Sequence, residues 1–183
     1  MSSPILAIAG PHGSGKSSVA KKLAKKLNMT HISAGQVFRD LAKERNVTLE
    51  QLSEDAENEP EIDIEIDNRT KELGSQPNTI IDAQLAAYFT PKNTLLKIYI
   101  TASPKIRYTR IASRDEKSLG EAETETKVRE VTERKRFKSL YDIEIDDLSP
   151  YDIIINTDNF DENTVFELCL SIILKAIDLK KSD

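Results

Sequence analysis

The feature that most constrains this chain is a glycine-rich octapeptide at residues 10–17, Gly-Pro-His-Gly-Ser-Gly-Lys-Ser, directly after the apolar run of residues 5–9. Its spacing fits G-x-x-x-x-G-K-S/T, in which the glycines let the backbone form a nest of N–H donors for phosphate groups. Lys16 supplies a mobile cation and Ser17 offers a hydroxyl to Mg²⁺. The sequence therefore predicts a site for a nucleoside triphosphate. The residues expected to hold it are Gly10, Pro11, His12, Gly13, Ser14, Gly15, Lys16, Ser17 and Ser18.

The residues after the octapeptide support this interpretation. Val19, Leu23 and Leu27 recur at four-residue spacing, as one face of an amphipathic helix requires. A strand, a glycine loop and a helix therefore follow in the required order, and the aligned N–H groups at the helix start attract phosphate. A glycine-rich turn that precedes a helix by chance is the alternative, and the order of elements disfavours it.

Composition limits the class of protein. With 183 residues, one domain is the default, and 38% hydrophobic residues suffice for a core. The net charge of −5 argues against a generally basic surface for nucleic acid, so substrate phosphates must be met locally. No apolar segment approaches the length of a membrane span, and the start of the chain lacks a secretion signal. We expect a cytoplasmic enzyme, with Cys169 as a small core residue.

The middle of the chain is mostly helical. After a short strand at residues 30–33, residues 36–73 carry helical patterns with few large apolar side chains and no strand. Thr48 and Gln51 fit a capping box, Pro60 fits a first helical turn, and Gly74 fits a helix end. This acidic segment resembles an insertion at the edge of a sheet and could move separately.

Further strands are expected at residues 79–82, 95–100 and 151–156, with a helix beginning after Pro104 and a last helix capped by Asp161. Strands that alternate with helices indicate a parallel sheet with helices on both faces. The predicted fold class is therefore α/β, with five parallel strands.

Asp82 ends the strand at residues 79–82, and such strand ends border the ligand crevice of an open α/β sheet. Beside Ser17, it is a candidate to hold Mg²⁺ through water. A helix or turn cap is the alternative role for this side chain.

Two helical rows of arginine fit phosphoryl transfer. Arg107, Arg110 and Arg114 share one helix face, and Arg129 and Arg136 flank Glu133 at the same spacing. Arginine aligns phosphate and stabilises equatorial charge without covalent chemistry, and Glu133 can orient one arginine by a bidentate pair. A solvated face crossed by Glu–Arg pairs is an equally weighted alternative.

Other polar residues are less specific. Arg39 begins the helical segment and can grip the phosphate of an acceptor, with Ser33 and Gly35 beside its sugar or base; a place on an ordinary helix surface is the alternative. His12 fits a tolerated loop position and His31 a structural one, because neither has the companions of a metal cluster. Solvated surface is the main interpretation of four acids, Asp63, Asp67, Asp146 and Asp147, although the first two could face an acceptor base.

These segments resemble the nucleoside monophosphate kinases, and most closely the archaeal type of cytidylate kinase. The resemblance covers nearly the whole chain and is carried by residues 10–17, 32–39, 60–67, 133–137, 141–149 and 151–157. The loop identifies only a broad superfamily, whereas Ser-Ala-Gly-x-x-Phe-Arg at residues 33–39 and the late segments are more specific.

The resemblance implies a P-loop NTPase-like, three-layer fold whose enzyme transfers the γ-phosphoryl group of ATP to CMP or dCMP with Mg²⁺. It places Lys16 and the loop amides on the donor phosphates, Ser17 and Asp82 on the metal, and Arg39 on the acceptor phosphate. Residues 36–73 become the acceptor-binding insertion and residues 113–128 a lid that excludes water. The resemblance places Arg107 and Arg110 on the helix that leads into this lid, and Arg129 and Arg136 on the helix that returns from it. It places residues 156–158 near the adenine. The enzyme is expected to be a monomer with no nucleic-acid or membrane partner.

One position departs from the resemblance. After the strand, the family usually has an acid, a small residue and then arginine, whereas this chain has Asp82-Ala83-Gln84. Gln84 donates hydrogen bonds but carries no charge, so an expected phosphate or base contact is weakened. UMP, AMP or a small alcohol therefore stays open as acceptor, as does a low-turnover nucleotide-binding assembly factor or switch.

Overall fold

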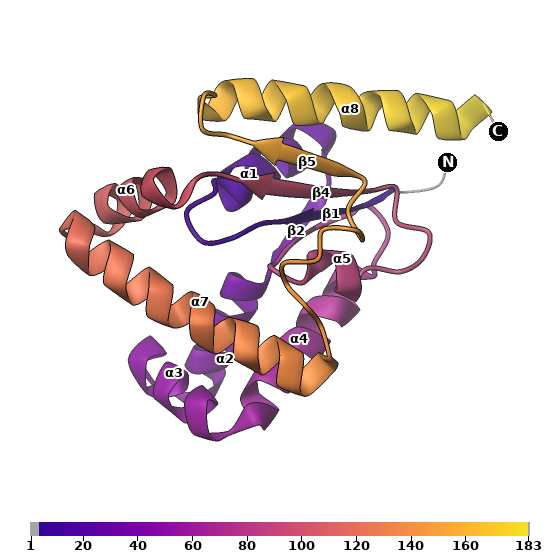
Figure 1. The fold of residues 1–183 in the computed structure, drawn as a ribbon. Coiled ribbons are helices and arrows are strands. Elements are labelled where there is room, and N and C mark those ends of the chain that lie inside the picture. Colours follow the sequence, from indigo (N-terminus) through magenta and orange to yellow (C-terminus); the bar gives the residue numbers. More distant parts are fainter. Residues whose placement is uncertain (1–3, 183) are drawn as a thin grey trace.

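The structure is a computed structural model that describes residues 4–182, apart from the side chains of residues 50, 53, 57 and 182. Its centre is a sheet of five parallel strands in the order β2-β3-β1-β4-β5 (Figure 1). The strands are β1 (Ile5–Ala9), β2 (Thr30–Ser33), β3 (Thr79–Asp82), β4 (Leu96–Thr101) and β5 (Ile153–Asn156). The predicted five-stranded parallel sheet is confirmed.

Helices connect the strands. They are α1 (Lys16–Leu27), α2 (Ala34–Arg45), α3 (Leu49–Asn58), α4 (Pro60–Gly74), α5 (Ala86–Phe89), α6 (Pro104–Asp115), α7 (Leu119–Tyr141) and α8 (Glu162–Ser182). The predicted capping box of Thr48 and Gln51 begins α3, and Asp161 accepts a 2.7 Å hydrogen bond from the Thr164 backbone at the start of α8. None of the helices in the described part of the chain is long and apolar enough to cross a membrane.

Strand β1 divides the core into two layers, because its successive side chains point to opposite faces of the sheet. Leu6 and Ile8 pack with α1 and α8, which Figure 1 shows on the same side of the sheet. Ala7 and Ala9 pack against the start of α5 on the other face. Cys169 of α8 is fully buried in the first layer, as the sequence predicts.

The helical segment between β2 and β3 has a small core of its own. Leu41, Leu52 and Ile62 come from α2, α3 and α4 and are each at most 1% exposed. The prediction of helices over residues 36–73 is confirmed. Movement of this segment as a separate unit stays a prediction.

The predicted lid, residues 113–128, includes the end of α6, a short connection and the first half of α7. Figure 1 shows α7 running from the end of α6 toward α4, to which Tyr141 and Arg136 join it. Ser118 caps α7 through a capping box with Glu121. One helix therefore links the lid segment to the helical segment that follows β2.

Candidate active site

Three strand ends meet at the glycine-rich loop. In the ladders, Ser33 pairs with Asp82 and Asp82 pairs with Ile8, so β1, β2 and β3 end together. The loop of residues 10–15 joins β1 to α1 at this edge. The register thus brings the predicted phosphate loop, Asp82 and Ser33 to one end of the sheet.

Two glycines allow the loop its close approach to the core. Gly10 has φ +147° and Gly13 has φ +76°, a region that disfavours side chains. A Cβ on Gly10 would lie 1.9 Å from the carbonyl oxygen of Ile100, and one on Gly13 would lie 2.5 Å from that of Arg107. The loop is therefore packed directly against the backbone of β4 and α6.

Two arginines of α6 hold the loop by its carbonyls. Arg107 Nη1 donates to the His12 carbonyl at 2.8 Å, and Arg110 Nη1 donates to the Ser14 carbonyl at 3.2 Å. Arg107 also pairs with Glu130 of α7, and Arg110 binds the hydroxyl of Thr157 at 2.8 Å. Both guanidinium groups thus bind protein here, and their contact with a transferring phosphate stays a prediction.

Lys16 is the first residue of α1 and faces two carboxylates of the site. Burial lowers the pKa of its ammonium group, and the charges of Asp82 and Glu133 partly offset that effect. In the described part of the chain, its ammonium group has no ion pair or hydrogen bond. Contact of this ammonium group with the phosphates of a nucleotide stays a prediction.

Asp82 is nearly buried and is held from β2. Its Oδ2 lies 3.2 Å from His31 Nε2, while its Oδ1 is buried without a hydrogen-bond partner among the residues that the structure describes. Burial raises the pKa of Asp82, but the hydrogen bond from His31, the Lys16 charge and the Ser17 hydroxyl outweigh it, so the pKa is lowered. The carboxylate is therefore ionised. The structural role expected for His31 fits this contact.

The donor set around Asp82 fits a magnesium ion. A hard cation takes oxygen ligands and keeps several waters, and the unpaired Asp82 Oδ1 and the Ser17 hydroxyl supply such oxygens. Over residues 4–182, no group of three or more His, Cys, Asp or Glu side chains is placed to hold a metal by itself. Further ligands would have to come from water and substrate phosphate.

Glu133 of α7 joins the loop to the end of β3. Its Oε2 lies 2.7 Å from His12 Nε2 and accepts a 2.7 Å hydrogen bond from Gln84, while its Oε1 accepts from Arg129 Nε at 3.0 Å. Burial raises the pKa of this carboxyl, but the donors His12 and Gln84 and the Arg129 charge hold it well below its usual range. Glu133 is thus a buried, ionised centre of the site.

Two expectations for this cluster were wrong or incomplete. In the described part of the chain, Glu133 makes no bidentate pair with an arginine: Arg129 contacts its Oε1 only, and His12 and Gln84 contact its Oε2. His12 is not merely a tolerated loop residue, since its ring is hydrogen-bonded to α7. Contacts between residues 121 positions apart leave no local signal in a sequence.

The proposed acceptor contacts lie together at the start of α2. Ser33 precedes that helix, a Cβ on Gly35 would lie 3.6 Å from Arg39 Nη1, and Arg39 is exposed and bonded to Gln36 at 2.9 Å. The structure brings Ser33, Gly35 and Arg39 together, whereas Gln84 is hydrogen-bonded to Glu133 of α7. Their contact with an acceptor stays a prediction.

The interpretation of Asp63 and Asp67 as solvated surface was wrong. Asp63 Oδ2 lies 3.0 Å from Arg136 Nε, with its side chain 14% exposed, and Asp67 accepts a 2.7 Å hydrogen bond from Tyr141. These contacts join α4 to α7. Arg136 is therefore paired within the protein, and its contact with phosphate stays a prediction.

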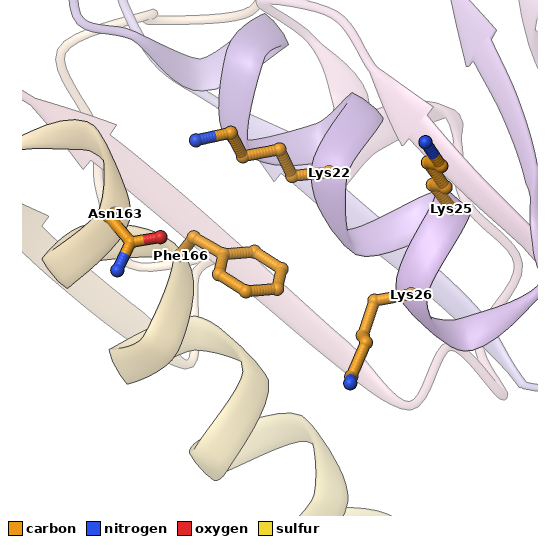
Figure 2. Close-up of a pocket in the computed structure, with 5 residues that line it drawn as sticks. All are labelled: Lys22, Lys25, Lys26, Asn163 and Phe166. Carbon is orange, nitrogen blue, oxygen red and sulfur yellow. The ribbon is translucent and has the colours of Figure 1, made fainter.

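Two further charged residues of the sequence analysis form ion pairs on the surface. Arg114 is 69% exposed and pairs with Asp115, and Asp146 is 75% exposed and pairs with Arg134. A separate surface groove lies between α1 and α8, where Figure 2 shows three lysines and two residues of α8. The residues lining this groove are Lys22, Lys25, Lys26, Asn163 and Phe166.

Known proteins are similar to this sequence over nearly its whole length. A family model described as an AAA domain matches residues 6–131. Cytidylate kinase of Archaeoglobus fulgidus is 44% identical over 177 residues, which cover 96% of each chain. Cytidylate kinase of Methanocella arvoryzae is 44% identical over 180 residues, covering 97% of this chain and 99% of that one. The chain belongs to the cytidylate kinase family. The predicted membership among nucleoside monophosphate kinases is confirmed.

Solved structures support the fold of this cytidylate kinase family member. Shikimate kinase from Bacteroides thetaiotaomicron covers 94% of the chain, and the chain covers 97% of it, with a TM-score of 0.62 at 16% identity. A gluconokinase from Sinorhizobium meliloti covers 99%, and the chain covers 98% of it, with a TM-score of 0.62 at 11% identity. The predicted P-loop kinase fold is confirmed.

Proposed function

We propose that this protein transfers the γ-phosphoryl group of ATP to CMP, giving CDP and ADP, with Mg²⁺ as the metal. The observation that carries the proposal is 44% identity to cytidylate kinases along nearly the whole chain, with the phosphate loop intact at residues 10–17. Among the described residues the Lys16 ammonium group and Asp82 Oδ1 have no hydrogen-bond partner, and both fit a Mg·ATP complex.

The donor end of the reaction follows from the loop. Its backbone amides and Lys16 bind the triphosphate, since aligned N–H groups at the start of α1 attract anions. Asp82 and Ser17 hold Mg²⁺, which neutralises charge on the phosphates. Arg107 and Arg110 fix the loop through its carbonyls, so its shape is set before ATP arrives.

The acceptor end is assigned to the start of α2. Arg39, exposed beside Gly35 and Ser33, receives the phosphate of CMP, because a planar guanidinium matches a phosphate with two hydrogen bonds. Residues 36–73 form the acceptor-binding insertion, and residues 113–128 close as a lid, excluding water that would otherwise accept the phosphoryl group.

Acceptor-dependent release of ADP tests the proposal. Turnover with Mg·ATP is compared for CMP, dCMP, UMP, AMP and shikimate, with Lys16→Met as a control for contaminating kinase. We expect CMP or dCMP to give the highest kcat/KM and Lys16→Met to lose at least about 100-fold in kcat. Turnover with CMP no faster than with UMP, AMP or shikimate would disprove the substrate assignment, and acceptor-independent, slow hydrolysis would favour a nucleotide-binding switch.

A further inference from the structure

The Glu133 carboxylate connects three parts of the site that are distant in the sequence. It accepts hydrogen bonds from His12 of the loop, from Gln84 after β3 and from Arg129 one turn earlier on α7. Its side chain is only 8% exposed. A buried charge is tolerated when donors satisfy it, so the three contacts stabilise one arrangement of these elements.

The direction of the His12 contact follows from the protonation states. Burial lowers the pKa of His12, which makes the ring neutral at pH 7, while Glu133 remains ionised. We assign the proton to Nε2, which then donates to Glu133, because a bare Nε2 would set its lone pair against the carboxylate oxygen at 2.7 Å. The same nitrogen lies 2.8 Å from Gln84 Nε2. Gln84 donates to the same oxygen at 2.7 Å.

His12 is consequently held from two sides. Its carbonyl accepts from Arg107 of α6 at 2.8 Å, and its ring donates to Glu133 of α7. Next to it, Gly13 packs against the α6 backbone with no room for a Cβ. His12 thus fixes the glycine-rich loop relative to both α6 and α7.

Arg129 is held at one end only. Its Nε donates to Glu133 at 3.0 Å, and its side chain is 65% exposed. Within the described part of the chain, its two terminal nitrogens have no hydrogen-bond partner. The guanidinium is therefore oriented by Glu133 while its outer edge is free to bind an anion.

We propose that Glu133 is a positioning residue that fixes Arg129 relative to the phosphate loop for phosphoryl transfer. The inference rests on the proposed function. An exposed arginine loses rotamer freedom when it binds, and a partner that already holds its Nε removes part of that cost. Preoriented charge stabilises the transition state without reorganisation, so the effect falls mainly on kcat.

A double-mutant cycle tests the coupling between Glu133 and Arg129. Glu133→Gln and Arg129→Ala are each expected to lower kcat by about 10- to 100-fold, with the KM for CMP changed by less than about threefold. The double variant should fall within about threefold of the slower single variant, because each change removes the same function. Lys138→Gln is the control, since Lys138 lies on the same helix outside the proposed lid and forms an exposed i,i+4 pair with Asp142. It should keep kcat within about twofold.

A second variant tests the loop contact and keeps the inference falsifiable if Glu133→Gln does not fold. His12→Ala leaves the Glu133–Arg129 pair in place and should weaken Mg·ATP binding by about 5- to 10-fold in calorimetry. This readout needs no acceptor, so a wrong acceptor and a wrong role for Glu133 give different results. Unchanged Mg·ATP affinity in His12→Ala, or single effects on kcat that multiply in the double variant, would overturn the inference.

Discussion

The hydroxyl of Tyr141, at the end of α7, donates a 2.7 Å hydrogen bond to Oδ2 of Asp67 on α4. Burial raises the pKa of Asp67 to about 6, although the hydrogen bond from Tyr141 acts in the opposite direction. The ordinary pKa of this carboxyl is 3.8, which we take for the unfolded chain. Between these two values the folded state binds more protons than the unfolded state.

The stability of the wild-type protein should therefore contain a term that grows as the pH falls. Protonation of Asp67 stabilises the folded state because its pKa is higher there than in the unfolded chain. This contribution to the free energy of unfolding is absent above pH 6 and increases toward pH 4.5. We expect it to contribute about 2 kcal/mol to the free energy of unfolding between pH 7 and pH 4.5. Asp67→Asn removes the titrating group, so urea unfolding of this variant should lack the term.

The measurement should stop at about pH 4.5, because below that pH the protonation of Glu133 adds an opposite effect on stability. Its pKa is lowered in the folded state, so its own contribution is present above pH 4.5 and is lost as the pH falls further. Asp146→Asn is the control, because Asp146 is 75% exposed. The prediction is contradicted if Asp67→Asn and Asp146→Asn give the same pH dependence.

Replacement of Arg39 tests the acceptor phosphate contact. Arg39→Ala should raise the KM for CMP and lower kcat, each by about tenfold or more, since a charged hydrogen bond to phosphate contributes about 1.5–3 kcal/mol. Arg45→Ala on the same helix is the control, because Arg45 pairs with Glu65 on the surface of the helical segment. Kinetics of Arg39→Ala that match those of Arg45→Ala would remove Arg39 from the site.

Closure of the lid predicts a change in hydrogen exchange. Backbone amides of residues 113–128 should exchange more slowly when a bisubstrate analogue joining cytidine and adenosine through phosphates is bound, because closure orders this segment over ATP. Helix α8, which packs with α1, serves as an internal reference. Equal protection of residues 113–128 in the free and bound protein would contradict a lid.

At the end of α4, Gly74 has no space for a side chain. A Cβ on Gly74 would lie 2.1 Å from Cδ1 and 2.3 Å from Cγ1 of Ile81 in the sheet. Gly74→Ala should therefore lower the free energy of unfolding by about 1–3 kcal/mol. Gly120→Ala meets nothing within 4 Å on α7 and should instead leave stability unchanged or raise it by up to about 1 kcal/mol. Urea midpoints distinguish the two, and equal midpoints would show that Ile81 yields to the methyl group.

The fold was accessible from the sequence because its signals are local. Strand ends, the capping box of Thr48 and Gln51, and Pro60 at the first turn of α4 all depend on neighbours within a few residues. The order of strands and helices then leaves few arrangements for a parallel sheet. The phosphate loop was equally visible, since its glycines and Lys16 lie within eight residues.

The hydrogen bonds and ion pairs that connect the site could not be predicted from local sequence patterns. The partners of Glu133, Asp63 and Asp67 come from elements that meet only after folding. Patterns of charge on a helix reveal which face is polar, but they do not distinguish a solvated pair from a buried contact. The arginine spacing on α6 was correct as a pattern, yet Arg107 and Arg110 proved to bind loop carbonyls.

Helix α7 has 23 residues and is about 35 Å long. It is fastened to the phosphate loop at Glu133 and, two turns later, to α4 at Tyr141. Because an α-helix is stiff, we expect a tilt of its first turns, which lie in the proposed lid, to reach both contacts. We therefore expect the proposed ATP and CMP sites to move together, because both are attached to α7.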